Sequence, residues 1–331
     1  MQAQDWSRVL SKYREPIALR SVFELAVSVL PFLMIFGLAC WALTISVWIA
    51  LGLSVLNGLF LVRIFLIQHD CGHGSFFKNR EVGDWVGRVL SVLTVTPYDV
   101  WRKSHATHHA TSGNLDRRGT GDIPTLTVRE YRQRSWAGRT AYWLCRNPLV
   151  LFGLGPAYIF LLLHRVPFGL MRAGWRYWLS VMLTNLAIAT VVGAVFWFGG
   201  WQAVAFVYLP TVLMGASIGM WLFFVQHQFE DTSWDNEQDW QVQDAAFHGS
   251  SHYILPEPLR WFSANIGAHH IHHLASRIPY YRLPEVLRDH DALNQCHRLT
   301  LRESFKCVKL HLWDEENRRL VSFAEARLQP V

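Results

Sequence analysis

The chain has 331 residues, of which 51% are hydrophobic and 17% charged, and its formal net charge is +6. With a pI of about 9.2 and a mean hydropathy of +0.13, it is too apolar for a typical globular domain. No nucleic-acid-binding motif accompanies the positive charge, so a nucleic-acid partner is not expected. The five scattered cysteines contain no C-x-x-C, which argues against a zinc ribbon or a disulfide framework.

The first third of the chain contains a long apolar run. Residues 1–20 are polar and show no signal-peptide core, so we expect a cytosolic N-terminal segment. From Val22 to Ile67 the only charged residues are Glu24 and Arg63. Since one crossing needs about 20 residues, this run predicts two transmembrane helices, at 22–43 and 47–68.

A second apolar run, from Tyr177 to Gln226, has no charged residue and is interrupted by Gly-Gly-Trp-Gln at 199–202. It predicts two further transmembrane helices, at 177–198 and 202–226. The stretch Val86–Val95 is too short to cross, and Pro148–Leu163 is borderline. We expect both to be interfacial or re-entrant.

The charge distribution predicts the orientation of these four helices. Residues 101–146 hold nine Lys or Arg against three Asp or Glu. By the positive-inside rule, the N-terminus, this middle loop and the C-terminal third lie in the cytosol. We therefore expect an all-α integral membrane fold: one four-helix domain over 21–295 with a cytosolic cap, followed by a cytosolic tail over 296–331. The charged last forty residues suit either a soluble tail or a part of the cap.

Histidines recur in clusters at the cytosolic ends of the predicted helices. The first cluster is HDCGH, the second HATHH and the third HHIHH, and a lone histidine ends the fourth predicted helix. Spacings of three and four residues place side chains on one face of a helix. The clustered residues are His69, His73, His105, His108, His109, His227, His269, His272 and His273.

Imidazole is a ligand suited to Fe, Zn, Cu and Ni. One zinc ion takes four ligands and would leave most of these histidines unused, whereas two ions would use all nine. No Glu is followed by His three residues later, which argues against a ferritin-like carboxylate site. We expect Asp70, inside the first cluster, to orient a ligand; Asp116 and Asp122 are candidates either for that role or for turn formation.

The three clusters, in this order, resemble the histidine boxes of the membrane fatty acid desaturase family. The stretches HHATSGNLDRRGTGDIPTLTVREY and NIGAHHIHHLASRIPYYRLPE are similar to its acyl-lipid, omega-6/delta-12-type branch, particularly the bacterial members. The similarity runs from about residue 20 to residue 295.

The resemblance implies an enzyme with two iron ions that uses O2 and two electrons to insert a cis double bond into a lipid acyl chain. The nine histidines would be the metal ligands, with His270 at a non-ligand position. Asn265 is a candidate for holding a metal-bound water. No His-Pro-Gly-Gly haem motif is present, so the resemblance implies a separate donor, a ferredoxin or a cytochrome b5-like protein. The double-bond position would follow from the distance to the end of the acyl tunnel.

Several alternatives remain open at this stage. A lipid hydroxylase or ketolase would use the same scaffold. A membrane zinc hydrolase is a further alternative, because HDCGH is similar to the zinc-binding motif H-E-x-x-H. A metal transporter is disfavoured because the histidines lie at helix ends rather than at the bilayer midplane. The basic residues Arg102, Lys103, Arg117 and Arg118 suit either an acidic electron donor or anionic lipid headgroups. The sequence leaves the oligomeric state open.

Overall fold

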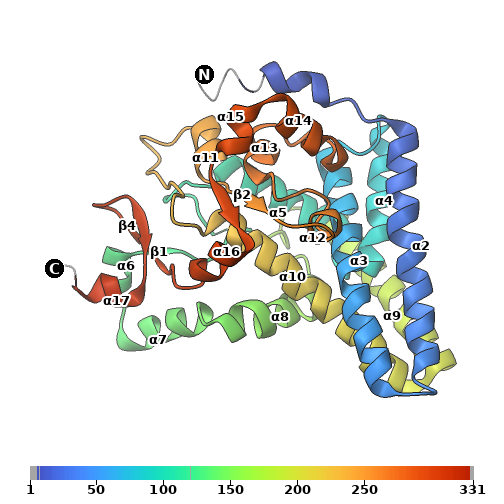
Figure 1. Ribbon diagram of the computed structural model, residues 1–331. Helices are drawn as coiled ribbons and strands as arrows, with labels where there is room; N and C mark the ends of the chain where they lie inside the picture. Colours follow the sequence, from blue (N-terminus) through green and yellow to red (C-terminus); the bar gives the residue numbers. More distant parts are fainter. Residues whose placement is uncertain (1–5, 7, 120, 329–331) are drawn as a thin grey trace.

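The structure is a computed structural model that describes residue 6, residues 8–119 and residues 121–328. Long apolar helices form one half of the molecule, and short helices and strands form a cap over one end of them (Figure 1). The mostly helical prediction is confirmed, although the described residues also include five strands of two or three residues.

Three helical stretches are long and apolar enough to cross a membrane, namely Ala18–Ala42 (α2), Val47–His73 (α3) and Trp175–His227. The last one contains α9 (Trp175–Ala203), the π-helical η4 (Val204–Tyr208) and α10 (Leu209–His227). A straight helix of 53 residues would be about 80 Å long, against a hydrocarbon layer of about 30 Å. Apart from Leu43, the four predicted spans lie within these helices, and where the bilayer begins and ends along them stays a prediction.

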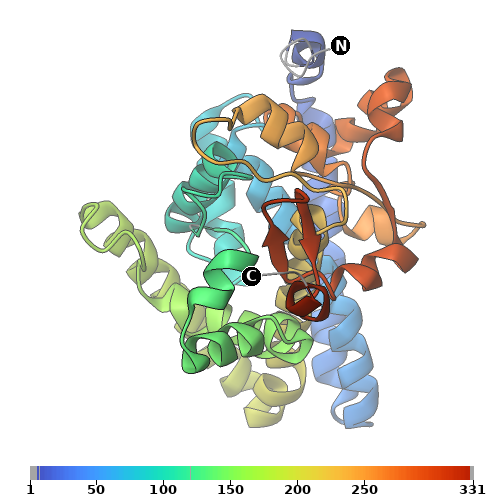
Figure 2. The same ribbon diagram turned by 90° about the vertical axis from the view of Figure 1, so that its left-hand side faces the viewer.

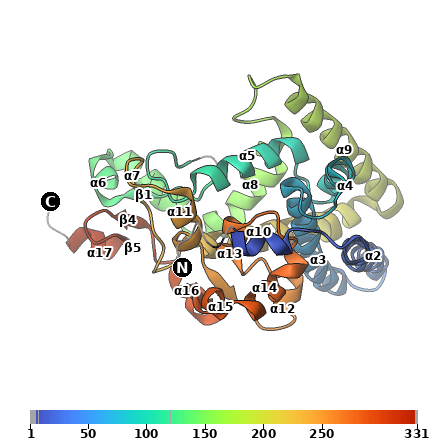
Figure 3. The ribbon, with the colours of Figure 1, turned by 90° about the horizontal axis from the view of Figure 1, so that it is seen from above.

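The third stretch bends at the predicted break. Gly200 has a φ of 71° and a ψ of −177°, outside the helical region. Its φ lies in the region that favours glycine, which explains a Gly-Gly pair at this point. From the bend, α9 and α10 diverge (Figures 1 and 3), and Figure 2 shows the first half of α9 projecting from the fold. Trp175, Leu183 and Leu186 are exposed there, as lipid-facing residues would be.

The helices α2 and α3 form an antiparallel hairpin, and α3 also packs along α10. Ser46 caps α3 by accepting a hydrogen bond from the Trp48 N–H at 3.3 Å. At the other end, Gly74 ends α3 in the left-handed conformation, directly after His73. The helix therefore runs five residues past the predicted span, into the cap.

Two helices follow α3 at the cap side, α4 (Arg80–Leu93) and α5 (Tyr98–Thr111). On α4, Val82, Trp85 and Val89 are exposed while Gly87 and Leu90 are buried. An apolar exposed face of this kind is typical of an interfacial helix, which is what the sequence predicts for 86–95.

The segment around Pro148–Leu163 forms a bent pair. Trp136–Cys145 (α7) and Val150–Arg165 meet at 62°, as in a broken span or a re-entrant loop. The second arm consists of the π-helical η2 (Val150–Leu154), α8 (Gly155–Leu161) and the 3-10 helix η3 (Leu163–Arg165).

The cap contains the remaining elements. They are η1 (Leu10–Tyr13), β1 (Leu126–Thr127), α6 (Val128–Gln133), α11 (Val242–His248), β2 (His252–Ile254), α12 (Leu259–Phe262), α13 (His269–Leu274), η5 (Tyr280–Arg282), α14 (Leu283–Asp289), α15 (Asp291–Gln295), β3 (Arg298–Thr300), α16 (Leu301–Cys307), β4 (Leu312–Asp314), β5 (Arg319–Val321) and α17 (Phe323–Leu328).

The C-terminal segment 296–328 is folded into the cap rather than standing apart as a tail. Strand β4 pairs in parallel with β1 of the middle loop and antiparallel with β5, and β3 pairs with β2. Leu312, Trp313 and Leu320 are almost completely buried, so this segment contributes to the core of the cap.

Candidate metal centre

All nine clustered histidines come together at the boundary between the long helices and the cap. They form two groups, and within each group the candidate ligand atoms all lie within 4.8 Å of one another. The first group is His69, His73, His105, His109 and His272; the second is His108, His227, His269 and His273. No other histidine among the described residues belongs to either group.

Four helices position these side chains. Helix α3 brings two histidines on its last turn, α10 brings His227 as its last residue, and α13 begins with His269. Figure 3 shows α13 among α3, α5 and α10. Helix α5 serves both groups: His105 and His109, four residues apart, point to the first, and His108 to the second.

Several Nε2 atoms in each group lie close to one another. The distance is 3.1 Å from His105 to His109 and from His109 to His272 in the first group. In the second group it is 3.1 Å from His108 to His227, 3.0 Å from His227 to His269 and 3.1 Å from His269 to His273. Nitrogens about 2.1 Å from one ion lie about 3.0 Å apart at right angles and about 3.4 Å apart at the tetrahedral angle. These distances are compatible with imidazoles that share one ion in each group.

The chemistry of the donor set also fits metal ions. All nine imidazoles are buried or half-buried, and the buried His73 Nε2 has no hydrogen-bond partner in the described part of the chain. An unpaired buried nitrogen is costly unless a ligand satisfies it. Burial, together with the neighbouring histidines, lowers the pKa of His105, His109 and His272 well below the usual value, and likewise the pKa of His269 and His273. These side chains are therefore neutral, which is the form that binds metals.

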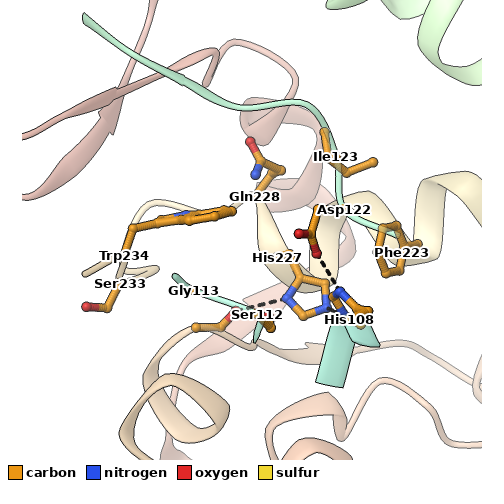
Figure 4. Close-up of a pocket in the computed structure, with 11 residues that line it drawn as sticks. His108, Ser112, Gly113, Asp122, Ile123, Phe223, His227, Gln228, Ser233 and Trp234 are labelled. Carbon is orange, nitrogen blue, oxygen red and sulfur yellow. Dashed lines mark hydrogen bonds and ion pairs between the residues drawn. The ribbon is translucent and has the colours of Figure 1, made fainter. Parts of the chain in front are cut away.

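Three of the histidines have a hydrogen-bond partner at Nδ1, the ring nitrogen that does not face the other imidazoles. Asp122 lies 2.6 Å from His108 Nδ1, the Gly249 carbonyl lies 3.0 Å from His227 Nδ1, and Asp70 lies 3.1 Å from His69 Nδ1. Such partners fix the tautomer and the orientation of a ligating imidazole. Figure 4 shows Asp122 pointing at His108 beside His227, around a cavity of about 10 Å³ that is large enough for one water molecule.

The other sequence candidates lie apart from the two groups. Asp116 accepts a hydrogen bond from the Glu237 N–H at 2.8 Å, which is a structural role. Asn265 lines a different cavity that none of the nine histidines borders, so its predicted water-holding role stays a prediction. His270, at the expected non-ligand position, contacts the Leu293 carbonyl at 2.9 Å.

Sequence reasoning missed the support behind Asp70. Its Oδ2 accepts a hydrogen bond from the Tyr280 N–H at 2.7 Å, and the Tyr280 hydroxyl donates to Glu24 at 3.1 Å. Glu24 in turn forms a buried ion pair with Arg63. The sequence did contain a signal for this ion pair. Glu24 and Arg63 are the only charged residues in the first apolar run, and charged residues inside a membrane rarely lack a partner.

Comparison with known proteins identifies the family. The model of the family described as "Fatty acid desaturase" matches residues 46–305. A "Fatty acid desaturase" of Bacillus subtilis (strain 168) is 41% identical over 325 residues, which is 98% of this chain and 92% of the relative.

More distant relatives have more specific names. The "sn-1 acyl-lipid omega-3 desaturase (ferredoxin)" of Synechocystis sp. is 28% identical over 69% of this chain and 64% of its own length. The "sn-1 oleoyl-lipid 12-desaturase" of Anabaena variabilis is 28% identical over 75% of this chain and 70% of its own. With two buried histidine groups suited to a two-metal site at the end of its apolar helices, the chain belongs to the fatty acid desaturase family.

Proposed function

We propose that this enzyme uses O2 to insert a cis double bond into an acyl chain of a membrane lipid. The observation that carries the proposal is the pair of buried imidazole groups, five and four, in a chain of the desaturase family. In the balanced reaction, two neighbouring methylene carbons each lose one hydrogen. O2, two electrons and two protons are consumed with those hydrogens, and two water molecules form.

The two groups would each hold one iron ion. Iron supplies redox chemistry with O2, which zinc does not. The close approach of the Nε2 atoms supports one ion in each group, and His73 Nε2 would gain the partner that it lacks.

The protein's own contribution is position and exclusion of water. Trp101 stacks on His105 with ring centroids 4.8 Å apart, and Phe223 packs against His108 and His227 at 5.1 and 5.2 Å. These apolar rings shield the imidazoles from water, while rigid helices fix where an acyl chain meets them. We propose an omega-6/delta-12-like position, which the name of the Anabaena relative supports.

We also propose a bacterial inner-membrane location with the site and both termini on the cytosolic side. The similarity to the Bacillus protein supports a bacterial membrane, and the basic middle loop supports the orientation. The electrons would come from a separate donor, a ferredoxin or a cytochrome b5-like protein. The name of the Synechocystis relative supports ferredoxin.

The test combines metal analysis with fatty-acid profiling of expressing cells. We expect two iron ions per purified chain and a new unsaturated acyl chain in the membrane lipids. His108→Ala should lose iron and product, whereas His248→Ala, at an exposed histidine outside both groups, should keep both.

Three outcomes would contradict the proposal. Hydroxylated lipids without new unsaturation would indicate a hydroxylase. About one zinc and no iron would indicate a hydrolase. An unchanged iron content in His108→Ala would show that the second histidine group does not bind a metal ion.

A further inference from the structure

A second cavity, of about 370 Å³, lies in the cap away from the histidine groups. It is lined by β2, by the loop that contains α12, and by residues of α14 and β3. Tyr253, Ser263 and Ala268 are buried at its base. The side chains of Arg260, Arg288 and Arg298 line it from exposed positions, so the cavity has an apolar or neutral base and a cationic mouth.

The charges at the mouth do not cancel. Three arginines line the cavity. Arg260 pairs with Glu257, which also lines it, and Arg288 pairs with the neighbouring Asp289 at 3.1 Å. Arg298 donates to the neutral amide oxygen of Gln295 at 2.8 Å and has no carboxylate partner within 4.0 Å in the described chain. A guanidinium presents paired donors that match a phosphate group.

The loop on one side of the cavity is held in an unusual conformation. Ala264 and Asn265 both have positive φ, 49° and 56°, which is rare for residues other than glycine. Asn265 lines the cavity, and its side-chain amide has no hydrogen bond in the described structure. Gly267 fits only because it lacks a Cβ, which would lie 2.2 Å from the Tyr253 carbonyl oxygen. Strained backbone of this kind is concentrated at ligand sites.

The predicted span 47–68 would place the cavity near the cytosolic lipid headgroups. Helix α12 packs beside α3 (Figure 1), and Phe60 of α3 contacts Trp261 and Phe262 with ring centroids 5.9 and 5.1 Å apart. Phe60 lies eight residues before the predicted cytosolic end of its span, or about 12 Å into the hydrocarbon. On that prediction, Trp261 and Phe262 would reach into the inner leaflet, and Arg260 directly precedes them in the chain.

We propose that this cavity binds the phosphate headgroup of the phospholipid whose acyl chain is desaturated, an inference that rests on the proposed function. Arg260 and Arg298 pair with the phosphate, and Asn265 donates from the loop. Ala268 at the base of the cavity directly precedes the candidate ligand His269, so the bound headgroup lies on the same segment as the metal site. With its ester end held there, the lipid is desaturated at a position counted from the carboxyl carbon.

The first test measures lipid binding to the full-length, iron-loaded enzyme in detergent. Native mass spectrometry would quantify retention of dioleoyl-phosphatidylglycerol and of dioleoylglycerol, which has the same chains without the phosphate. We expect Arg260→Gln/Arg298→Gln to retain phosphatidylglycerol at least about tenfold more weakly, as the loss of charge-assisted hydrogen bonds predicts. Retention of dioleoylglycerol should not change.

Two matched variants control for folding and for charge. Arg319→Gln removes an exposed arginine that pairs with Glu325 in the C-terminal part of the cap, and it should bind like the parent. Arg298→Lys keeps the charge and should retain an intermediate affinity. An equal loss of phosphatidylglycerol binding in Arg319→Gln would show a general effect of surface charge and would overturn the proposal.

Competition separates the sources of phosphate. Displacement of the lipid by millimolar inorganic phosphate, or tighter binding of oleoyl-CoA than of phosphatidylglycerol, would overturn a lipid-headgroup site. Resistance to both competitors supports it.

The second test uses phosphatidylglycerols with 16- and 18-carbon chains. A bound headgroup predicts a double bond at the same distance from the carboxyl carbon in both, and a constant distance from the methyl end would overturn the proposal. Since binding is measured separately, an enzyme that retains phosphatidylglycerol but makes no double bond would contradict the proposed function and leave the headgroup site standing.

Discussion

Glu24 of α2 and Arg63 of α3, 39 residues apart, form an ion pair in which each side chain is only 2% exposed. Arg63 also donates to the Ser28 hydroxyl at 3.0 Å and lies 3.9 Å from the Trp261 ring. Through Tyr280 the pair connects to Asp70 and so to His69. One buried pair thus joins two long helices to the cap and to the candidate metal site.

This pair predicts an asymmetric effect on stability. Glu24→Leu leaves Arg63 buried without a carboxylate and should cost about 3–5 kcal/mol. Arg63→Met should cost less, because Glu24 keeps Arg20 at 2.6 Å. The apparent melting temperature of the purified protein in detergent measures both effects.

The double variant Glu24→Leu/Arg63→Met provides the control. It should be more stable than Glu24→Leu alone, because no buried charge remains. A double variant as unstable as the sum of the two single variants would contradict this account of the pair.

The contact between Asp122 and His108 predicts an effect on metal affinity. Asp122→Asn no longer fixes the His108 tautomer and should lower the affinity of the second histidine group for its metal by about 10- to 100-fold. Iron content after dialysis against a graded chelator series measures this affinity. Asp116→Asn is a matched control, since Asp116 contacts the Glu237 backbone instead of a histidine. Equal loss of iron in the two variants would contradict a specific role for Asp122.

The buried imidazoles predict that the metal-free protein loses stability as the pH falls. Burial holds the pKa of His105, His109 and His272 well below the unfolded value of about 6.5. Below that pH the unfolded chain takes up protons and the native protein does not. Each such histidine therefore lowers the free energy of unfolding by about 1.4 kcal/mol per pH unit. Melting temperatures of chelator-treated protein, measured between pH 8 and 5.5, should change little down to about pH 7 and then fall below about pH 6.5, less steeply in His109→Gln. A flat profile would show that these imidazoles are protonated in the native state.

Much of the site was predictable from local spacing. Histidines three or four residues apart share a helix face wherever the helix lies, so the nine residues could be chosen from the sequence. Which of them belong to the group of five and which to the group of four could not be predicted, because this depends on how α5 is placed between α3 and α13. Asp122 contacts His108 from a loop fourteen residues away, and no local pattern separates it from Asp116.

The fold divides in the same way. Apolar runs and the Gly-Gly pair predicted the long helices and the bend at Gly200. The pairing of Leu126 with Leu312 was not predictable, since strands of two or three residues have no periodicity to detect and their partners are far apart in the chain. The sequence therefore left open whether the C-terminal segment is a tail or part of the cap, and its buried residues place it in the cap.

The close approach of α4 and α5 gives a further prediction. A Cβ at Gly87 would lie 2.2 Å from the Tyr98 ring, and Tyr98 is fully buried at the first turn of the helix that carries three of the histidines. Gly87→Ala should force these helices apart and cost about 1–3 kcal/mol. The displacement of α5 should also lower iron content and desaturation.

Gly83, one turn earlier on α4, provides the comparison. It is buried, yet a Cβ there would meet no atom within 4 Å. Gly83→Ala should therefore stabilise the protein by about 0.5–1 kcal/mol, because alanine favours the helix more than glycine does. Gly87→Ala should lower both the melting temperature and the iron content, whereas Gly83→Ala should raise the melting temperature and leave the iron content unchanged. A Gly87→Ala variant as stable and as iron-rich as Gly83→Ala would show that α4 does not fix the position of α5, and hence of His105, His108 and His109.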